Sequence, residues 1–222
     1  AQDMSQPNKS SWDRLIHAIK YIKGTSTMAG FIPCKAKGEK PIWTCYCDSD
    51  QSSDRSARNQ GKCRYGSIVT VHGFPVHYKT QTTSVAMAQP SMGTDGNVCT
   101  SSTEAEIYGC SNAATHVMHI SYIAEELGYE FPKPFVMLMD NAAAEVFCNN
   151  TASYTRLKHI DLRQQWVELS RKAGVMVPKH IDTKLNLADM FTKGLTGIIL
   201  QGMTGRVLTK MVAFPNKDQK GL

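Results

Sequence analysis

The apolar stretch KPFVMLMD at residues 133–140 sharply limits the architectures open to this chain. The run is too short for most helices, so it predicts a buried strand. Before it, from Thr103 to Leu127, apolar residues recur at helical spacing, and Gly128 is a natural stop for that helix. After it, NAAAEVFCNN at 141–150 predicts a short helix. A buried strand between two helical segments is typical of a sheet whose faces are covered by helices.

The rest of the chain supplies further strands and helices in a simple order. PIWTCYCD at residues 41–48 predicts a strand, and residues 63–83 predict a hairpin that turns near Gly73. One more strand is predicted at residues 175–182. Helical periodicity recurs in three other segments, at residues 10–24, 157–174 and 186–195. Three strands in succession, then helix, strand, helix, helix, strand and helix, predict an α/β domain with a mixed five-stranded sheet and helices on its faces.

Three regions follow from this pattern. Residues 1–40 contain an amphipathic helix, capped by Ser10 or Ser11, and a linker rich in glycine, lysine and threonine. Residues 41–196 hold the predicted sheet and form the main domain. Residues 197–222 are a tail for which the sequence predicts no structure.

Composition narrows the class of protein. The formal net charge of +6 fits an anionic partner such as a nucleic acid, although many unrelated enzymes share a modest basic excess. No apolar run reaches transmembrane length and the first ten residues are polar, so neither a membrane span nor a signal peptide is predicted. The seven cysteines form no CxxC pair, and the alternation of Cys45 with Cys47 indicates core residues rather than zinc ligands. These features predict an intracellular protein with reduced thiols.

The stretch SSTEAEIYGC at residues 101–110 places Glu104 and Glu106 two positions apart near a helix start. Residues two apart on a helix lie about 200° apart and cannot share a face. Glu106 lies about 50° from the centre of the apolar stripe and Glu104 about 110° away, so Glu106 is the one that can look along the sheet. A capping box is the alternative, with either Thr103 and Glu106 or Ser101 and Glu104 as its pair.

Three aspartates lie where predicted elements begin or end. Asp48 ends the first strand, Asp140 ends the buried strand, and Asp189 lies in the first turn of the last helix. Each alone could be a turn former, a helix cap or a first-turn acid. Together with Glu106 they are four acids around one sheet, and carboxylates without histidine or thiolate partners suit Mg²⁺ or Mn²⁺. Asp50 is an alternative to Asp48, which is nearer the strand proper.

Several stretches resemble the ribonuclease H region of copia-type (Ty1/copia) retrotransposon Pol polyproteins. SWDRLIHAIKYIKGT is similar to the helix that closes the preceding reverse transcriptase region, and CDSDQSSDRSARNQG is similar to the aspartate-rich opening of the family. SSTEAEIYG, MLMDNAAA, RLKHID and NLADMFTKGL follow in the family's order and roughly its spacing. The resemblance covers roughly residues 8–195. The opening DSDQSSD departs from the family, because the usual aromatic residue and glycine are missing.

The resemblance implies a ribonuclease H-like fold, with three antiparallel strands followed by two parallel ones. It implies an endonuclease that hydrolyses the RNA strand of RNA–DNA hybrids with two Mg²⁺ ions, for which Mn²⁺ can substitute. The implied catalytic and metal-binding acids are Asp48, which bridges the ions, Glu106 and Asp140, which hold one, and Asp189, which holds the other. Implied partners are the hybrid and the reverse transcriptase portion of the polyprotein, without a membrane. The implied location is the cytoplasm, including a virus-like particle.

Eight residues are candidates for contact with the nucleic acid: Ser49, Arg55, Arg58, Asn141, Arg156, Lys158, His159 and His180. Ser49 and the backbone near Asn141 could contact 2′-hydroxyl groups, and the cationic side chains could track phosphates. Each has a plainer alternative. A lysine or arginine is usually part of a solvated surface, His159 could be a core histidine on a helix face, and His180 could be an ordinary strand histidine.

Two other functions are compatible with the same sequence. The chain could be a decayed module of this fold that binds nucleic acid without cleaving it. It could also be an integrase of the wider ribonuclease H-like group. The short gap between the first strand and the hairpin, together with the SSTEAE and ADMFTK stretches, argues against an integrase.

Overall fold

The computed structural model describes residues 7–30, 39–51, 62–86, 101–149 and 162–210. The chain forms two compact units. The smaller unit comprises residues 1–31 and 208–222, and the larger unit comprises residues 32–207. The functional division predicted at residues 1–40, 41–196 and 197–222 stays a prediction.

The smaller unit contains helix α1, Lys9–Gly24, and a short antiparallel pair of strands. These strands are β1, Met28–Ala29, and β7, Thr209–Lys210. The expected helix is present, but its cap is Asn8, whose side chain accepts a hydrogen bond from the Ser11 backbone, rather than Ser10 or Ser11. Asn8 is the cap because its side-chain oxygen reaches the free backbone amide of Ser11, three residues later in the chain. The apolar side chains of α1, including Trp12, are largely exposed.

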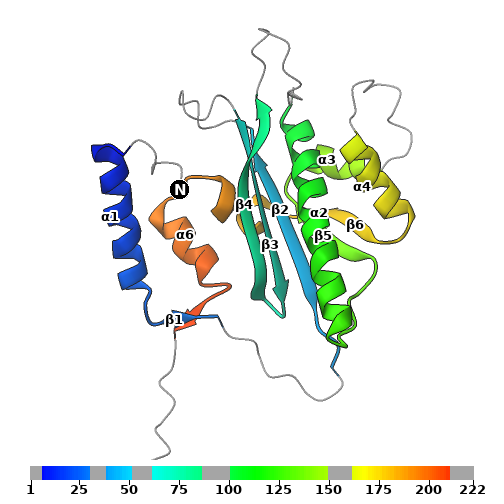
Figure 1. Cartoon of the computed structure of the whole chain (residues 1–222), viewed down its shortest axis with the longest axis horizontal. Helices are drawn as coiled ribbons and strands as arrows, with labels where there is room; N and C mark the ends of the chain where they lie inside the picture. The colour runs from blue at the N-terminus through cyan, green and yellow to red at the C-terminus, as the bar shows by residue number, and fades with distance from the viewer. Residues whose placement is uncertain (1–6, 31–38, 52–61, 87–100, 150–161, 211–222) are drawn as a thin grey trace, which may run out of the picture. The chain divides into compact units, whose positions relative to one another are not determined.

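The larger unit is built on a mixed five-stranded sheet with the strand order β4-β3-β2-β5-β6 (Figure 1). The pairs β4–β3 and β3–β2 are antiparallel, and the pairs β2–β5 and β5–β6 are parallel. The predicted fold class, three antiparallel strands followed by two parallel ones, is therefore confirmed. The strands are β2, Trp43–Asp50; β3, Lys62–Val71; β4, Phe74–Ala86; β5, Phe135–Met139; and β6, Met176–His180.

The predicted hairpin turn joins β3 to β4 through His72 and Gly73. Both residues have positive φ, 50° and 84° respectively. A two-residue turn of this kind matches the right-handed twist of the two strands, and glycine adopts it without steric cost. The turn places β4 at the edge of the sheet and β3 between β4 and β2.

Helices cover both faces of the sheet. On one face lie α2, Ser102–Glu126; α3, Ala142–Asn149; and α4, Leu162–Lys172. The main core lies on this face, where Cys45, Cys47, Met137 and Met139 pack against the apolar side of α2. Burial of each large apolar side chain of this kind contributes about 1.5–3 kcal/mol. The alternation of the strand puts Cys45 and Cys47 in this core, as expected for small apolar residues.

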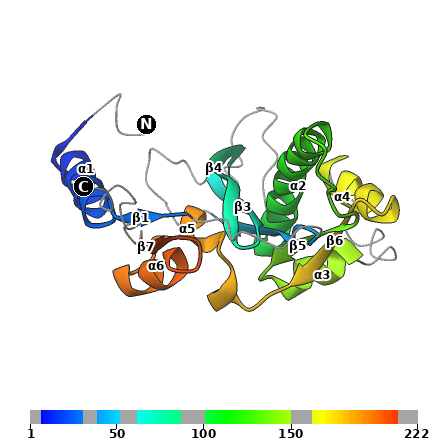
Figure 2. The same ribbon diagram turned by 90° about the horizontal axis from the view of Figure 1, so that it is seen from below.

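The opposite face is covered by α5, Asp189–Thr192, and α6, Gly197–Thr204. Ile68, Leu187 and Met203 form the buried centre of this second layer. Figure 2 shows α2 and α4 on one side of the sheet and α6 on the other. The helix predicted at 186–195 is thus only four residues long, and a further helix lies in the region for which no structure was predicted. Thr192 ends α5 because the next residue, Lys193, takes up an extended backbone.

Gly66 on β3 allows α5 to lie directly on the sheet. A Cβ atom at Gly66 would lie 2.8 Å from Phe191 Cβ, 2.8 Å from Thr192 Cγ2 and 3.0 Å from the Ala188 carbonyl oxygen. Gly66→Ala is therefore expected to push α5 off the sheet and to lower the free energy of unfolding by about 1–3 kcal/mol, as overpacking does. Urea denaturation measures this loss.

The matched control is Gly202→Ala. Gly202 lies in α6, and a Cβ atom added there would meet no atom of the described residues within 4 Å. The control should be neutral or slightly stabilising, since alanine favours a helix over glycine. Equal stability of the Gly66→Ala variant and the parent protein would contradict the close approach of α5.

Candidate active site

Three aspartates from separate parts of the sequence converge at one edge of the sheet. Asp48 lies near the end of β2, Asp140 directly follows β5, and Asp189 is the first residue of α5. One carboxylate oxygen from each lies within 4.8 Å of the others. The parallel pairing of β2 with β5 explains why Asp48 and Asp140 meet, because the carboxyl ends of parallel strands lie at the same edge. We refer to these three residues as the aspartate cluster.

The third aspartate is brought to the cluster by a buried side chain. Asn186 is fully buried, and its amide nitrogen donates to the Cys47 carbonyl oxygen at 3.1 Å. Its amide oxygen accepts a hydrogen bond of 3.1 Å from the backbone of Ala188. Asn186 thereby fastens the turn before α5 to the strand that carries Asp48. Asn186 is not among the predicted site residues.

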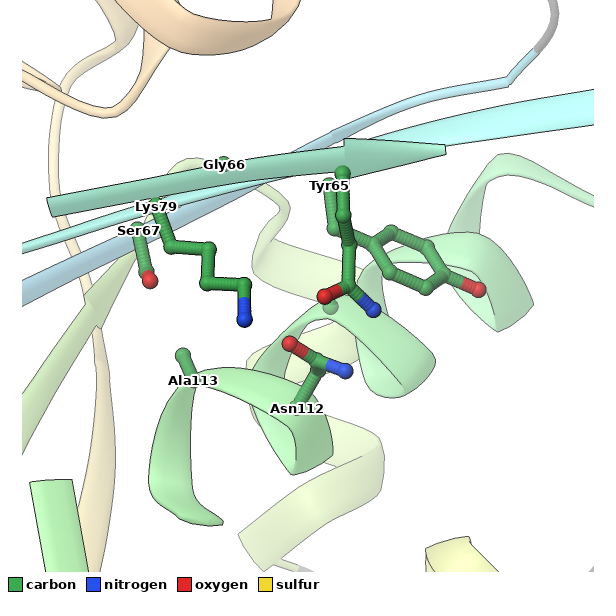
Figure 3. A pocket seen from close by; sticks show the side chains of 8 residues that line it. Tyr65, Gly66, Ser67, Lys79, Asn112 and Ala113 are labelled. Atoms are coloured by element: carbon green, nitrogen blue, oxygen red, sulfur yellow. The ribbon is translucent and has the colours of Figure 1, made fainter. Parts of the chain in front are cut away.

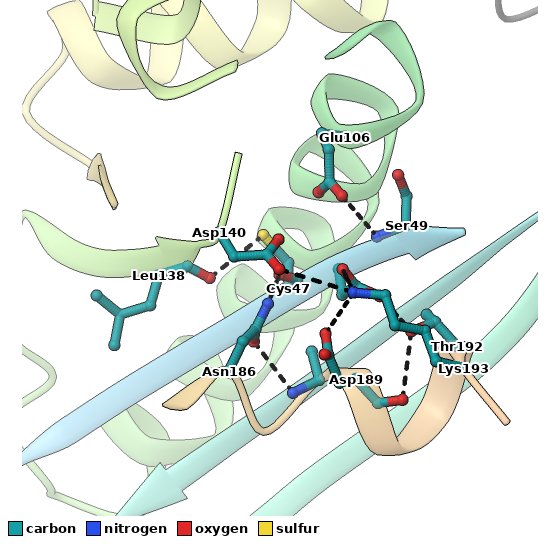
Figure 4. A network of polar contacts seen from close by, with 11 residues as sticks. Cys47, Ser49, Glu106, Leu138, Asp140, Asn186, Asp189, Thr192 and Lys193 are labelled. Carbon is teal, nitrogen blue, oxygen red and sulfur yellow. Dashed lines mark hydrogen bonds and ion pairs between the residues drawn. The ribbon is translucent and has the colours of Figure 1, made fainter. Parts of the chain in front are cut away.

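Lys193 occupies the middle of the aspartate cluster. Its Nζ atom lies 2.8 Å from Asp189 Oδ1, 3.1 Å from Asp48 Oδ1 and 3.6 Å from Asp140 Oδ2 (Figure 4). The neighbouring Thr192 hydroxyl donates to Asp48 Oδ2. A single ammonium group therefore forms ion pairs with three carboxylates. Thr192 and Lys193 belong to the same ADMFTK stretch as Asp189 but are not among the predicted site residues.

Glu106 lies beside the cluster rather than within it. The side chain is buried, and Oε1 accepts a hydrogen bond of 3.2 Å from the Ser49 backbone amide. Oε2 is buried and has no hydrogen-bond partner in the part of the chain that the structure describes. The cap of α2 is Ser101, whose hydroxyl accepts from the Glu104 backbone at 3.2 Å. Of the two capping alternatives the structure therefore has the serine at 101, and Glu106 is the inward glutamate.

Burial and mutual repulsion raise the pKa values in this site. Burial raises the pKa of Asp48, against hydrogen bonding from Thr192 and the charge of Lys193, while Asp140 adds repulsion. Burial, with repulsion from Asp48 and Asp140, raises the pKa of Glu106 well above its usual range. Burial opposes a charged Lys193, but its contacts with Asp189, Asp48 and Asp140 raise the pKa of Lys193. Crowded acids of this kind favour additional positive charge.

The residues fit a hard divalent cation. The donor set is made of carboxylate oxygens, and the unpartnered Oε2 of Glu106 is one more oxygen available next to the cluster. Oxygen-only sites of this kind suit Mg²⁺ or Mn²⁺ rather than Zn²⁺. One ammonium group cannot balance four carboxylates. Asp48 belongs to the aspartate cluster and Asp50 does not, among the residues that the structure describes.

The titration of Asp189 predicts how stability depends on pH when no divalent ion is added. Burial, then repulsion from Asp48 and Asp140 against attraction from Lys193, raises the pKa of Asp189 from 3.8 to about 6. The folded state therefore holds this proton more tightly than the unfolded chain does. Protonation of Asp189 therefore adds to the free energy of unfolding. This contribution is fully present below the unfolded pKa and is lost as the pH rises through about 6.

Urea unfolding in chelator, at pH steps from 4 to 7, measures this loss. The free energy of unfolding should fall across that window in the parent protein and should fall less in Asp189→Asn. The same pH profile in both proteins would show that Asp189 does not titrate in this way.

Of the eight residues predicted to contact nucleic acid, three lie in the described part of the chain. Ser49 is buried next to Asp48, and its hydroxyl has no hydrogen-bond partner among the described residues. Asn141 caps α3, because its side-chain oxygen accepts a 3.0 Å hydrogen bond from the Ala144 backbone. His180 is exposed at the end of β6, opposite Met139. The other five lie outside the described residues: Arg55, Arg58, Arg156, Lys158 and His159.

No protein-family model matches the chain. Curated relatives are the retrovirus-related Pol polyprotein from transposon RE2 of Arabidopsis thaliana, 26% identical over 207 residues, and that from transposon TNT 1-94 of Nicotiana tabacum, 27% identical over 191 residues. These matches cover 93% and 86% of this chain, and the chain spans about 13% of the length of each relative.

Two solved structures are also similar. They are LC11 RNase H1 in complex with an RNA/DNA hybrid, with a TM-score of 0.45, and RNase H1 from the halophilic archaeon Halobacterium salinarum, with a TM-score of 0.39. Each is 14% identical, and each match covers 68% of this chain and 94% or 93% of the neighbour. Over nearly its whole length, then, this chain is similar to a segment of copia-type Pol polyproteins, and the resemblance predicted from its motifs is confirmed.

Proposed function

We propose that this chain hydrolyses the RNA strand of RNA–DNA hybrids, as an endonuclease that depends on Mg²⁺. The observation that carries the proposal is the convergence of Asp48, Asp140 and Asp189 at one edge of a ribonuclease H-like sheet, with Glu106 beside them. The similarity to transposon Pol polyproteins supports an RNA–DNA hybrid as the substrate, because reverse transcription makes such hybrids.

In this proposal the aspartate cluster and Glu106 hold two Mg²⁺ ions, for which Mn²⁺ can substitute. When bound, such ions lower the pKa of a coordinated water and stabilise the departing oxygen of a phosphodiester. The chain itself orients the ligands. Thr192 holds one oxygen of Asp48, and the Ser49 backbone holds one oxygen of Glu106. Lys193 neutralises part of the repulsion among the aspartates, and ion binding requires its ammonium group to move away from their oxygens.

A cleavage assay tests the proposal. A labelled RNA–DNA hybrid, an RNA duplex and a DNA duplex of the same sequence are incubated with the protein in Mg²⁺, in Mn²⁺ and in chelator. We expect cleavage of the RNA strand of the hybrid only, in either metal, with no cleavage in chelator. Cleavage of all three duplexes, or cleavage that persists in chelator, would contradict the proposal.

Lys193 also supports a second candidate, a module that binds nucleic acid without cleaving it. Its ammonium group already lies among the three aspartates, so the cluster has a counter-ion of its own. This candidate predicts binding of the hybrid without hydrolysis in either metal. The same assay, read for binding as well as for products, separates the two.

The proposal has consequences for partners and location. Because the chain spans about 13% of its curated relatives, we propose that the reverse transcriptase portion of such a polyprotein is a partner. The proposed location is intracellular, where such hybrids form. No helix in the described part of the chain is long and apolar enough to span a membrane.

A further inference from the structure

A narrow polar pocket lies between the edge strand β4 and the middle of α2. Its polar side chains come from Ser67 on β3, Lys79 and Gln81 on β4, and Asn112 on α2. Figure 3 shows the ammonium group of Lys79, the amide of Asn112 and the hydroxyl of Ser67 directed into the same space. Ser67 and Lys79 are partners in the β3–β4 register, which places both side chains on the face that α2 covers. The pocket therefore gathers hydrogen-bond donors around one cation.

Two imidazole rings lie next to this pocket, farther along α2. His77 lies two residues before Lys79 on β4, and His116 lies one helical turn after Asn112. Their ring centroids are 5.2 Å apart. The Nε2 atom of each ring is buried and has no hydrogen-bond partner in the described part of the chain. Both nitrogen atoms are covered by protein atoms, so the two rings support the wall of this region rather than contact a ligand.

The charges around these rings favour an anion over a metal cation. Burial, then Lys79 and His119, lower the pKa of His77. Burial, then Lys79 and the other two histidines, lower the pKa of His116. The charged neighbours that act on both rings are all basic, and they would repel a bound metal ion. An anion would be attracted by Lys79 and would accept hydrogen bonds from the surrounding donors.

We propose that Lys79 and Asn112, with Ser67 and Gln81 beside them, form a binding site for a backbone phosphate of a nucleic acid. This inference rests on the proposed function for the identity of the partner, and it adds a contact away from the acidic residues. Gly66 pairs with Asp48 on one side and with Thr80 on the other. The backbone of Lys79 is therefore about two strand spacings, roughly 10 Å, from that of Asp48. The two side chains lie on opposite faces of the sheet, Lys79 toward α2 and Asp48 toward α5. A phosphate held by Lys79 is not the one that is hydrolysed; it fixes the register of the substrate.

The salt dependence of binding tests this site. Hybrid affinity is measured by fluorescence anisotropy over a series of salt concentrations, with Asp140→Asn as the background so that no cleavage occurs. Lys79→Gln is expected to weaken binding about three- to tenfold and to reduce the slope of log K against log salt by about 1, as loss of one phosphate contact does. Asn112→Ala should weaken binding without changing the slope, because it removes no charge.

Lys133→Gln is the matched control, because it removes the same charge from an exposed position just before β5, at the opposite end of that strand from Asp140. It should change neither affinity nor slope. Lys79 is exposed, so Lys79→Gln is expected to fold, and circular dichroism checks this. Lys79→Arg should restore both affinity and slope. A structural role for Lys79 would not produce a change in slope that an arginine reverses.

Nuclear magnetic resonance of the imidazole and side-chain amide groups gives a second readout, with inorganic phosphate and with the hybrid as separate probes. An unchanged slope in Lys79→Gln overturns the proposal. Chemical-shift changes that appear with phosphate but not with the hybrid also overturn it. The proposal is overturned as well if the two histidines bind Zn²⁺ while Lys79→Gln leaves hybrid affinity unchanged. Failure of hydrolysis with an intact slope effect would refute the proposed function alone. Hydrolysis with no slope effect would refute this site alone.

Discussion

Asp48→Asn is expected to abolish hydrolysis of an RNA–DNA hybrid, with a loss of about 10³-fold or more in rate, equivalent to about 4 kcal/mol of transition-state stabilisation. Asp48 is fully buried and is in contact with Lys193 and Thr192 at the centre of the site. The amide keeps the shape of the side chain but removes the charge that a divalent ion requires. Initial rates at saturating Mg²⁺ measure the loss.

Asp182→Asn is the control for Asp48→Asn. Asp182 is exposed and caps the short 3₁₀ helix Thr183–Leu185, and asparagine caps as well as aspartate does. The control should keep the parent rate. Hydrolysis by Asp48→Asn within tenfold of the parent would contradict a catalytic role for the aspartate cluster.

Lys193→Met is expected to make the protein depend on divalent ions for its stability. Without the ammonium group, Asp48 and Asp189 lose their nearest positive charge while they stay buried. Breaking a buried ion pair costs about 3–5 kcal/mol, and the partial exposure of Lys193 puts the expected loss near the lower value, at about 3 kcal/mol. Mg²⁺ should restore most of this loss, because it binds the folded state of the variant without competition from Lys193.

Urea unfolding with chelator and with Mg²⁺ measures both effects. Lys184→Met is the control, because Lys184 is exposed and lies in the same region of the chain. It should leave stability unchanged in both conditions. A Lys193→Met variant that is as stable in chelator as the parent would show that Lys193 does not balance the cluster.

The sequence was sufficient to predict the sheet and the acids that end its strands. Asp48 lies near the end of one recognisable strand and Asp140 directly follows another, so the parallel pairing of these strands brings the two aspartates together. Helical geometry indicated that Glu106, rather than Glu104, can lie on the buried face, as the structure has it. The same stretch also allowed Glu106 to be part of a capping box, and only the structure, with Ser101 as the cap, decides between the two. These predictions depend on the spacing of apolar residues along strands and helices, which can be read directly from the local sequence.

The parts that the sequence did not reveal depend on tertiary contacts. Helix α5 has four residues, too few for a periodic pattern, so its end at Thr192 could not be placed. The inward direction of Lys193 follows from that end and from the contact of α5 with Gly66 on a distant strand. In the sequence Asn186 has no feature that distinguishes it from an ordinary loop asparagine. Its hydrogen bond to the Cys47 carbonyl oxygen shows that it holds the turn before α5 against β2.

Anomalous scattering from a crystal grown with Mn²⁺ tests the arrangement of the site most directly. We predict anomalous peaks bounded by the carboxylate oxygens of Asp48, Asp140 and Asp189, with Glu106 adjacent and the Lys193 ammonium group moved away from the aspartate oxygens. Peaks elsewhere on the molecule only, with Lys193 still held among the three aspartates, would contradict the account.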